Sequence, residues 1–116
     1  MIINIDKLEI AALTFHMNIM RPSFRNIIKK NYPAKLKDYI SSYDYVKCEA
    51  TIALETQVDA YTLNLNIVDL DVLRAFLDAY INKSQTINDE AKSIEFQQHL
   101  DALHSVKIKA DAVAAA

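Results

Sequence analysis

The stretch VDAYTLNLNIVDLDVLRAFLDAYINK, residues 58–83, contains two different hydrophobic patterns in succession. Apolar and polar residues first alternate, which is typical of a strand with one buried face. Apolar residues then recur at helical spacing on one side of a helix. The alternating apolar positions are Tyr61, Leu63, Leu65 and Ile67, and the helical ones are Leu70, Leu73, Phe76, Leu77, Tyr80 and Ile81. The stretch therefore predicts a strand over 60–68 and a helix over 70–83, with Asp69 as its N-cap.

A second alternating segment precedes this stretch, over residues 45–55. One face would carry its small and apolar residues, Val46, Cys48, Ala50, Ile52 and Leu54. Two strands joined by a short connection around 55–59 pair most simply as an antiparallel hairpin.

The first twenty residues fit two structures. Asp6 followed by Glu9 can form a capping box, which favours a helix with an apolar stripe from Leu8 to Ile19. The alternative is a central strand near 7–17 that is apolar on both faces. The residues alone leave this choice open.

Helices are expected in the remaining segments. Pro22 suits a first helical turn, so a helix is predicted over 22–42, interrupted at Pro33. A polar link over 83–88 and a helix over 89–104 that starts at Asn88 follow the central stretch. We expect one domain over 1–105 and a low-complexity tail over 106–116, and we find no internal repeat.

The composition excludes several classes of site. The 116 residues include no glycine, which phosphate-binding loops and nucleophile elbows require. The single cysteine, Cys48, excludes an internal disulfide, and we expect it to be a small buried residue. No apolar run is long enough to span a membrane. We therefore expect a small cytoplasmic protein that is not an enzyme and holds no cofactor or metal.

Basic residues are concentrated between residues 21 and 37, a segment that contains no acidic residue. Arg21, Arg25, Lys29 and Lys30 are candidate nucleic-acid contacts, because cations spaced along a helix can bind phosphates. Tyr32 and Tyr39 lie nearby in the sequence and could stack on bases. The alternative is the solvated side of an amphipathic helix that has no partner.

The other polar candidates have simpler explanations. Glu95 and His99 share a helix side, but two ligands make a poor metal site, and His104 points elsewhere. His16 stands alone among apolar residues, which favours a core or edge position. Asp69 and Asp71 flank a helix start, where carboxylates are favoured without any catalytic role.

The helix over 70–83 is also a candidate surface for a protein partner. Small residues on its exposed side would let another helix approach. The candidate partner-binding residues are Leu73, Arg74, Ala75, Phe76, Asp78 and Tyr80.

The segment 63–81, LNLNIVDLDVLRAFLDAYI, resembles the small dimerisation subunit of the KEOPS complex. The resemblance is carried by an alternating strand, an Asp, a Leu-Arg-Ala sequence and a late Tyr. The matching positions here are Asp69, Leu73, Arg74, Ala75, Leu77 and Tyr80. The chain departs from the family at Asp78, Asn82 and Lys83.

The resemblance implies a strand–helix–strand–strand–helix order, which makes 7–17 the first strand. With it, we predict an α+β fold with a small three-stranded antiparallel sheet, helices on one face and an extra C-terminal helix. The family's subunit is a non-catalytic scaffold that forms dimers, contacts the catalytic subunit and supports threonylcarbamoyladenosine modification of tRNA. The expected partners are therefore a protein, as homodimer or heterodimer, and tRNA. The alternative is a small viral or mobile-element protein that inhibits a host enzyme or defence complex.

Overall fold

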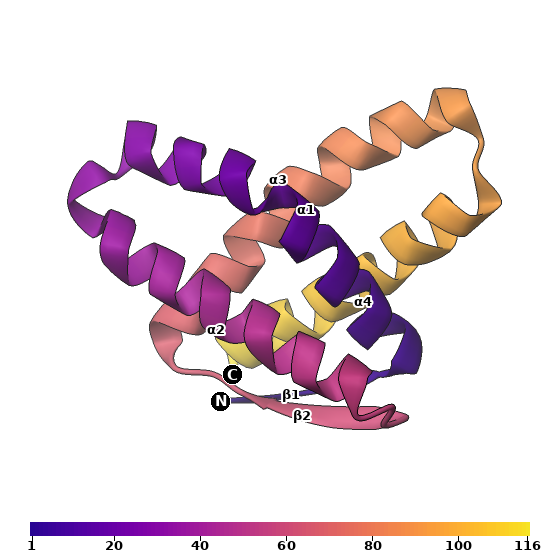
Figure 1. The fold of residues 1–116 in the computed structure, drawn as a ribbon, viewed down its shortest axis with the longest axis horizontal. Helices are drawn as coiled ribbons and strands as arrows, with labels where there is room; N and C mark the ends of the chain where they lie inside the picture. Colours follow the sequence, from indigo (N-terminus) through magenta and orange to yellow (C-terminus); the bar gives the residue numbers. More distant parts are fainter.

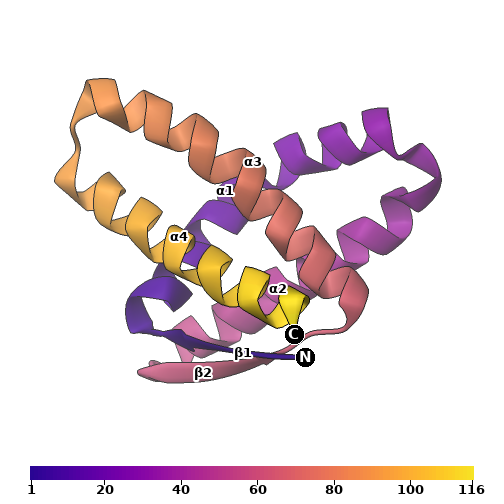
Figure 2. The same cartoon turned by 180° about the vertical axis from the view of Figure 1, so that it is seen from behind.

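The computed structural model describes residues 1–116 as a mostly helical α+β fold on a two-stranded sheet. The antiparallel strands β1 (Ile2–Asp6) and β2 (Ala60–Asn64) lie at one end, and the helices cover one of their faces (Figure 1). Two helical hairpins rise from the sheet and diverge, one made of α1 and α2 and the other of α3 and α4 (Figures 1 and 2). The helices are α1 (Lys7–Asn31), α2 (Leu36–Glu55), α3 (Ile67–Ala91) and α4 (Ile94–Ala115), with the 3-10 helix η1 (Pro33–Lys35) between the first two.

The structure contains two copies of a strand–helix–helix unit, a structural duplication that our expectation of no internal repeat missed. Helices α1 and α3 each have 25 residues, and their first residues lie 60 positions apart. Both begin with a capping box, Asp6 with Glu9 and Asn66 with Asp69. Strand pairing places Ile3 opposite its own equivalent, Leu63, so an approximate twofold axis passes through this pair.

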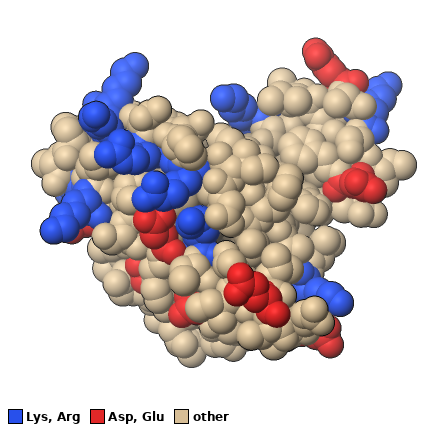
Figure 3. All heavy atoms as spheres, viewed as in Figure 1, with Lys and Arg blue, Asp and Glu red and all other residues tan.

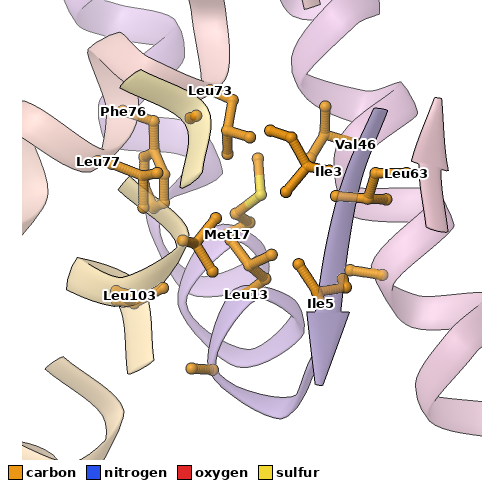
Figure 4. Close-up of a cluster of buried hydrophobic side chains, with 14 of the residues drawn as sticks. Ile3, Ile5, Leu13, Met17, Val46, Leu63, Leu73, Phe76, Leu77 and Leu103 are labelled. Carbon is orange, nitrogen blue, oxygen red and sulfur yellow. The ribbon is translucent and has the colours of Figure 1, made fainter. Parts of the chain in front are cut away.

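The buried residues repeat at the same interval of 60. Equivalent core positions fall in both strands, both first helices and both second helices. The equivalent pairs include Ile3 and Leu63, Ile10 and Leu70, Leu13 and Leu73, Met17 and Leu77, Tyr43 and Leu103, Val46 and Val106, and Ala50 and Ala110. Several of these pairs meet in one cluster between the helices and the sheet (Figure 4). The two halves therefore bury the same faces around one shared core.

The predicted strands over 7–17 and 45–55 are both helical, so the predicted three-stranded sheet is wrong in detail. The capping box at Asp6 starts α1, as the helical alternative for the N-terminus predicted. In α2, Tyr43, Val46, Ala50 and Ala53 are buried at helical spacing. Val46 and Ala50 satisfy both a period of two and a spacing of four, which is why the alternation misled the prediction.

The predicted helix boundaries at Pro22 and in the polar segment 83–88 were also wrong. Pro22 lies inside α1, on an exposed turn between the buried residues Met17 and Phe24. Packing on both sides of Pro22 carries the helix past the lost hydrogen bond. The predicted link over 83–88 belongs to α3, since Ser84 and Asn88 are buried. The side chain of Asn88 bonds Ser93 and Gln97, which satisfies its buried amide.

Three further expectations were corrected. Asn66 is the N-cap of α3, and Asp69 is the third residue of its capping box. Cys48 is exposed on α2 instead of buried. Residues 106–116 belong mostly to α4 and pack on the rest of the chain, because Val106 and Ala110 are fully buried.

Two residues have positive backbone φ angles, Gln57 (φ 56°) and Lys92 (φ 54°), although their side chains do not favour that region. Lys92 ends α3 in the left-handed conformation. A side chain beyond glycine costs about 1 kcal/mol in that region. We therefore expect Lys92→Gly to raise the free energy of unfolding by up to about 1 kcal/mol in urea titrations. A similar gain from glycine at the helical position Lys83 would contradict this explanation.

Candidate nucleic-acid interface

The hairpin formed by the end of α1 and the start of α2, residues 21–39, is here called the basic arm. Six Lys or Arg side chains lie in it, and Asp38 is its one acidic residue. The blue surface in Figure 3 gathers over this arm. Arg25, Lys29 and Lys30 are exposed and make no ion pair, and the same holds for Lys35 and Lys37. These five side chains leave an uncompensated positive surface.

Arg21 has a different role from the other cations in the basic arm. Its guanidinium donates two hydrogen bonds to Asp44 on α2, with Nε to Oδ1 at 2.7 Å and a terminal nitrogen to Oδ2 at 2.8 Å. These bonds hold the pKa of the Asp44 carboxyl below its usual range. Arg21 therefore braces α1 against α2 and is less available to a partner than the cations further along the arm.

Two tyrosines lie among the cations. Tyr32 is 58% exposed, and its ring meets that of Tyr39 edge to face at 6.1 Å. The Nζ atom of Lys35 lies 5.7 Å from the centre of the Tyr39 ring. Below them, a groove of about 320 Å³ runs between the arm and α3, lined mainly by apolar side chains such as Phe24, Ile27 and Val72. The arm therefore presents charge, exposed aromatic surface and an apolar groove together.

The second half of the chain provides an internal comparison. We call residues 81–99, the equivalent hairpin between α3 and α4, the acidic arm. At the positions equivalent to Lys29, Lys30 and Lys35 it carries the opposite charge. The substitution pairs are Lys29 with Asp89, Lys30 with Glu90, Lys35 with Glu95, Arg25 with Gln85 and Lys37 with Gln97. A similar helical hairpin thus forms in the second half without these cations, although the 3-10 helix η1 has no counterpart there.

The predicted partner surface on α3 is largely occupied within the chain. Leu73 and Phe76 are core residues, and Tyr80 is half-buried. Arg74 donates to Asp111 on α4 at 2.8 Å, and Asp78 pairs with Lys107 on α4 at 3.0 Å. The pKa of Asp111 is lowered by hydrogen bonds from Lys107 and Arg74. Of the six candidates, only Ala75 and Asp78 are exposed.

A second polar cluster lies where the two halves meet. His16 is 1% exposed, as expected for a core histidine, and its two nitrogens face the Tyr80 hydroxyl at 2.5 Å and Nδ1 of His99 at 3.1 Å. Burial, and secondarily the nearby His99, lower the pKa of His16 to about 4. The equivalent positions hold Phe76, Met20 and Tyr39, so the histidine pair is specific to one half. No sequence pattern predicts this contact, because its members are far apart in the chain.

Other combinations of residues do not assemble. His104 lies on an exposed part of α4 away from this cluster. No three His, Cys, Asp or Glu side chains come close enough to share a metal ion. The Asp69 carboxylate accepts from the backbone N–H of Asn66 in the capping box of α3, and Asp71 is exposed beside the groove. No helix in the structure combines the length and the apolar content that a bilayer-spanning segment requires.

The basic arm, with its five exposed and unpaired cations, is therefore the candidate site. Neither a protein-family model, nor a curated protein, nor a solved structure matches the chain.

Proposed function

We propose that this protein is a non-catalytic RNA-binding protein and that the basic arm is its RNA contact. The observation that carries the proposal is the group of five exposed, unpaired cations on one hairpin. Bringing like charges together on one surface costs free energy, and an anionic partner offsets that cost. A phosphate backbone presents charges at the regular spacing that such a row can match.

The exposed tyrosines favour RNA with unpaired bases over a uniform duplex. Tyr32 lies within the cationic surface and is 58% exposed, and the partly buried Tyr39 meets its ring edge to face. Unpaired bases can stack on such rings while the phosphates contact lysine, and each stacked base contributes about 1–3 kcal/mol. A double helix would engage the cations but leave the rings without a partner.

A narrower role follows from the resemblance of residues 63–81 and stays a prediction. A scaffold of a KEOPS-type complex would bring RNA to a catalytic partner, and the basic arm would serve as its tRNA contact. The observed order, β–α–α–β–α–α, differs from the strand–helix–strand–strand–helix order of that family. The rival, a small inhibitor of a host enzyme, would use the same arm against an acidic protein surface, and RNA titration separates the two.

The proposal predicts that exchanging charges between the arms moves RNA binding. The variant Arg25→Gln/Lys29→Asp/Lys30→Glu introduces the residues that the acidic arm already carries on the same backbone. We expect it to bind an unstructured RNA oligonucleotide about 100-fold more weakly in fluorescence anisotropy. The slope of log affinity against log salt should fall by about 2, since each contact with single strands contributes about 0.7.

A matched control and a gain-of-binding variant sharpen the test. Lys7→Glu/Lys47→Glu removes positive charge far from the arm and should leave affinity within about twofold at moderate salt. Asp89→Lys/Glu90→Lys gives the second arm a positive tip and should strengthen RNA binding. Equal losses of RNA affinity in the arm variant and the control would show that binding depends only on net charge, and would contradict the proposal.

A further inference from the structure

We infer that the acidic arm of one copy docks on the basic arm of a second copy, so that the protein forms a dimer that RNA takes apart. The occupant of the groove beside the basic arm is thus the tip of the partner's acidic arm, residues 89–95. Only the competing role of RNA rests on the proposed function. The dimer itself depends only on charge, shape and symmetry within this chain.

Charge complementarity is the first argument. Lys29, Lys30 and Lys35 make no ion pair within the chain, and neither do their equivalents on the other arm. Those equivalents are Asp89, Glu90 and Glu95. All six side chains are exposed. Lys29 and Lys30 near the end of α1 occupy the same helical positions as Asp89 and Glu90 near the end of α3. Surfaces of opposite sign are suited to mutual docking.

Apolar surface is the second argument. The tip of the acidic arm carries Ile94, which is 77% exposed, with Glu95 beside it. Ile87, 56% exposed, lies further down the same arm. The groove beside the basic arm is apolar along most of its length, and Asp71 is its one acidic lining residue. The tip of the acidic arm, residues 89–95, carries three acidic residues and one basic residue, Lys92.

Symmetry determines how many copies take part. Both arms point away from the sheet at the same end of the molecule (Figure 1). Two copies facing each other with these ends together, related by a twofold axis, place each basic arm against an acidic arm. The contact forms twice and leaves no arm free, so the assembly closes as a dimer instead of growing into a filament.

The proposed contact is tested first without RNA, by sedimentation equilibrium of the full chain at about 50 mM and about 500 mM salt. We expect a dimer at low salt that dissociates at high salt. Lys29→Asp/Lys30→Glu and Asp89→Lys/Glu90→Lys should each weaken self-association by about tenfold or more, since like charges then face each other. An equimolar mixture of the two variants should restore the dimer, because every contact again joins opposite signs.

Two further variants separate the contact from general charge effects. Ile94→Ser changes an exposed residue and should weaken the dimer while its salt dependence is retained. Lys7→Glu/Lys47→Glu should leave the dimer intact. A monomer at low salt, or a mixture of charge variants that stays monomeric, would overturn the inference even if RNA binding were confirmed.

The competing role of RNA is measured separately. Addition of an unstructured RNA oligonucleotide to the dimer should yield one protein chain per RNA site. A dimer that persists at saturating RNA would overturn the competition. A dimer that is unaffected because no RNA binds would instead contradict the proposed function and leave the dimer contact supported.

Discussion

Replacing Phe76 with alanine should lower the free energy of unfolding by about 3–5 kcal/mol, the cost of removing a large buried aromatic side chain. Phe76, on α3, is 2% exposed and belongs to the buried core cluster (Figure 4). Its ring packs on those of Phe24, Tyr43 and Tyr80, with ring centres 5.9, 5.6 and 5.4 Å away. The cavity would therefore open between the two halves, where neither half can collapse to fill it independently. Urea unfolding followed by circular dichroism measures the change.

Phe15→Ala is the matched control for this substitution. Phe15 lies on the same face of the protein as the histidine cluster but is 54% exposed. Its loss should cost about 1 kcal/mol or less, because little area returns to water. A loss below about 1 kcal/mol for Phe76→Ala, or similar losses at the two sites, would contradict the shared core that joins the duplicated units.

Lowering the pH from about 7 to about 4 should reduce the stability of the fold through His16, by about 3 kcal/mol if its pKa falls from 6.5 to about 4 on folding. The folded protein keeps His16 neutral, whereas the unfolded chain protonates it below pH 6.5. The unfolded state thus binds more protons between these values, and stability falls with decreasing pH. The stability that comes from keeping His16 neutral is fully present above pH 6.5 and is lost as the pH falls toward 4. Urea unfolding at a series of pH values measures it.

The variant His16→Phe isolates this contribution. Phenylalanine occupies the equivalent position, Phe76, in the other half of the fold. The variant should fold, and its stability should fall less steeply between pH 6.5 and 4 because the burial of a titratable ring is removed. His104→Phe, at an exposed position on α4, serves as the control and should retain the wild-type pH profile. Identical profiles for wild type and His16→Phe would contradict the assignment.

Part of the fold could be predicted from the residues because local and tertiary preferences agree there. The strand before residue 65 and the helix after it were predicted, and Leu70, Leu73, Phe76 and Leu77 are buried as their spacing indicated. The prediction of a strand over 45–55 was wrong for a physical reason. Its residues fit either period, and the resemblance had assigned residues 7–17, which form part of the neighbouring helix α1, to a strand as well.

The duplication was missed because the two halves share a pattern and few identities. Core positions repeat by hydrophobicity while surface positions differ freely and even reverse charge. The identical equivalents are Asn4 and Asn64, Leu13 and Leu73, Ile27 and Ile87, Val46 and Val106, Lys47 and Lys107, and Ala50 and Ala110. A comparison of burial pattern at a fixed interval would have revealed what residue identity did not.

The basic arm is the part of the candidate site that the sequence already indicated. Arg21, Arg25, Lys29 and Lys30 lie on one hairpin as their spacing predicted, although the structure assigns Arg21 mainly to Asp44. The partner surface on α3 could not be judged from sequence, because it depended on where α4 would pack. Arg74 pairs with Asp111 and Asp78 pairs with Lys107, and both partners lie on α4. These partners are distant in the sequence, so no local pattern around α3 reveals them.

The central claim, that one arm of a duplicated fold binds RNA, is tested most directly by nuclear magnetic resonance of the labelled protein titrated with an unstructured RNA oligonucleotide. The experiment is run at a salt concentration that keeps the free protein monomeric, so that no second copy covers the arm. The account predicts chemical-shift changes concentrated in residues 25–39, with the equivalent residues 85–99 unaffected. Changes distributed equally over the two arms, or confined to the sheet end of the molecule, would contradict it.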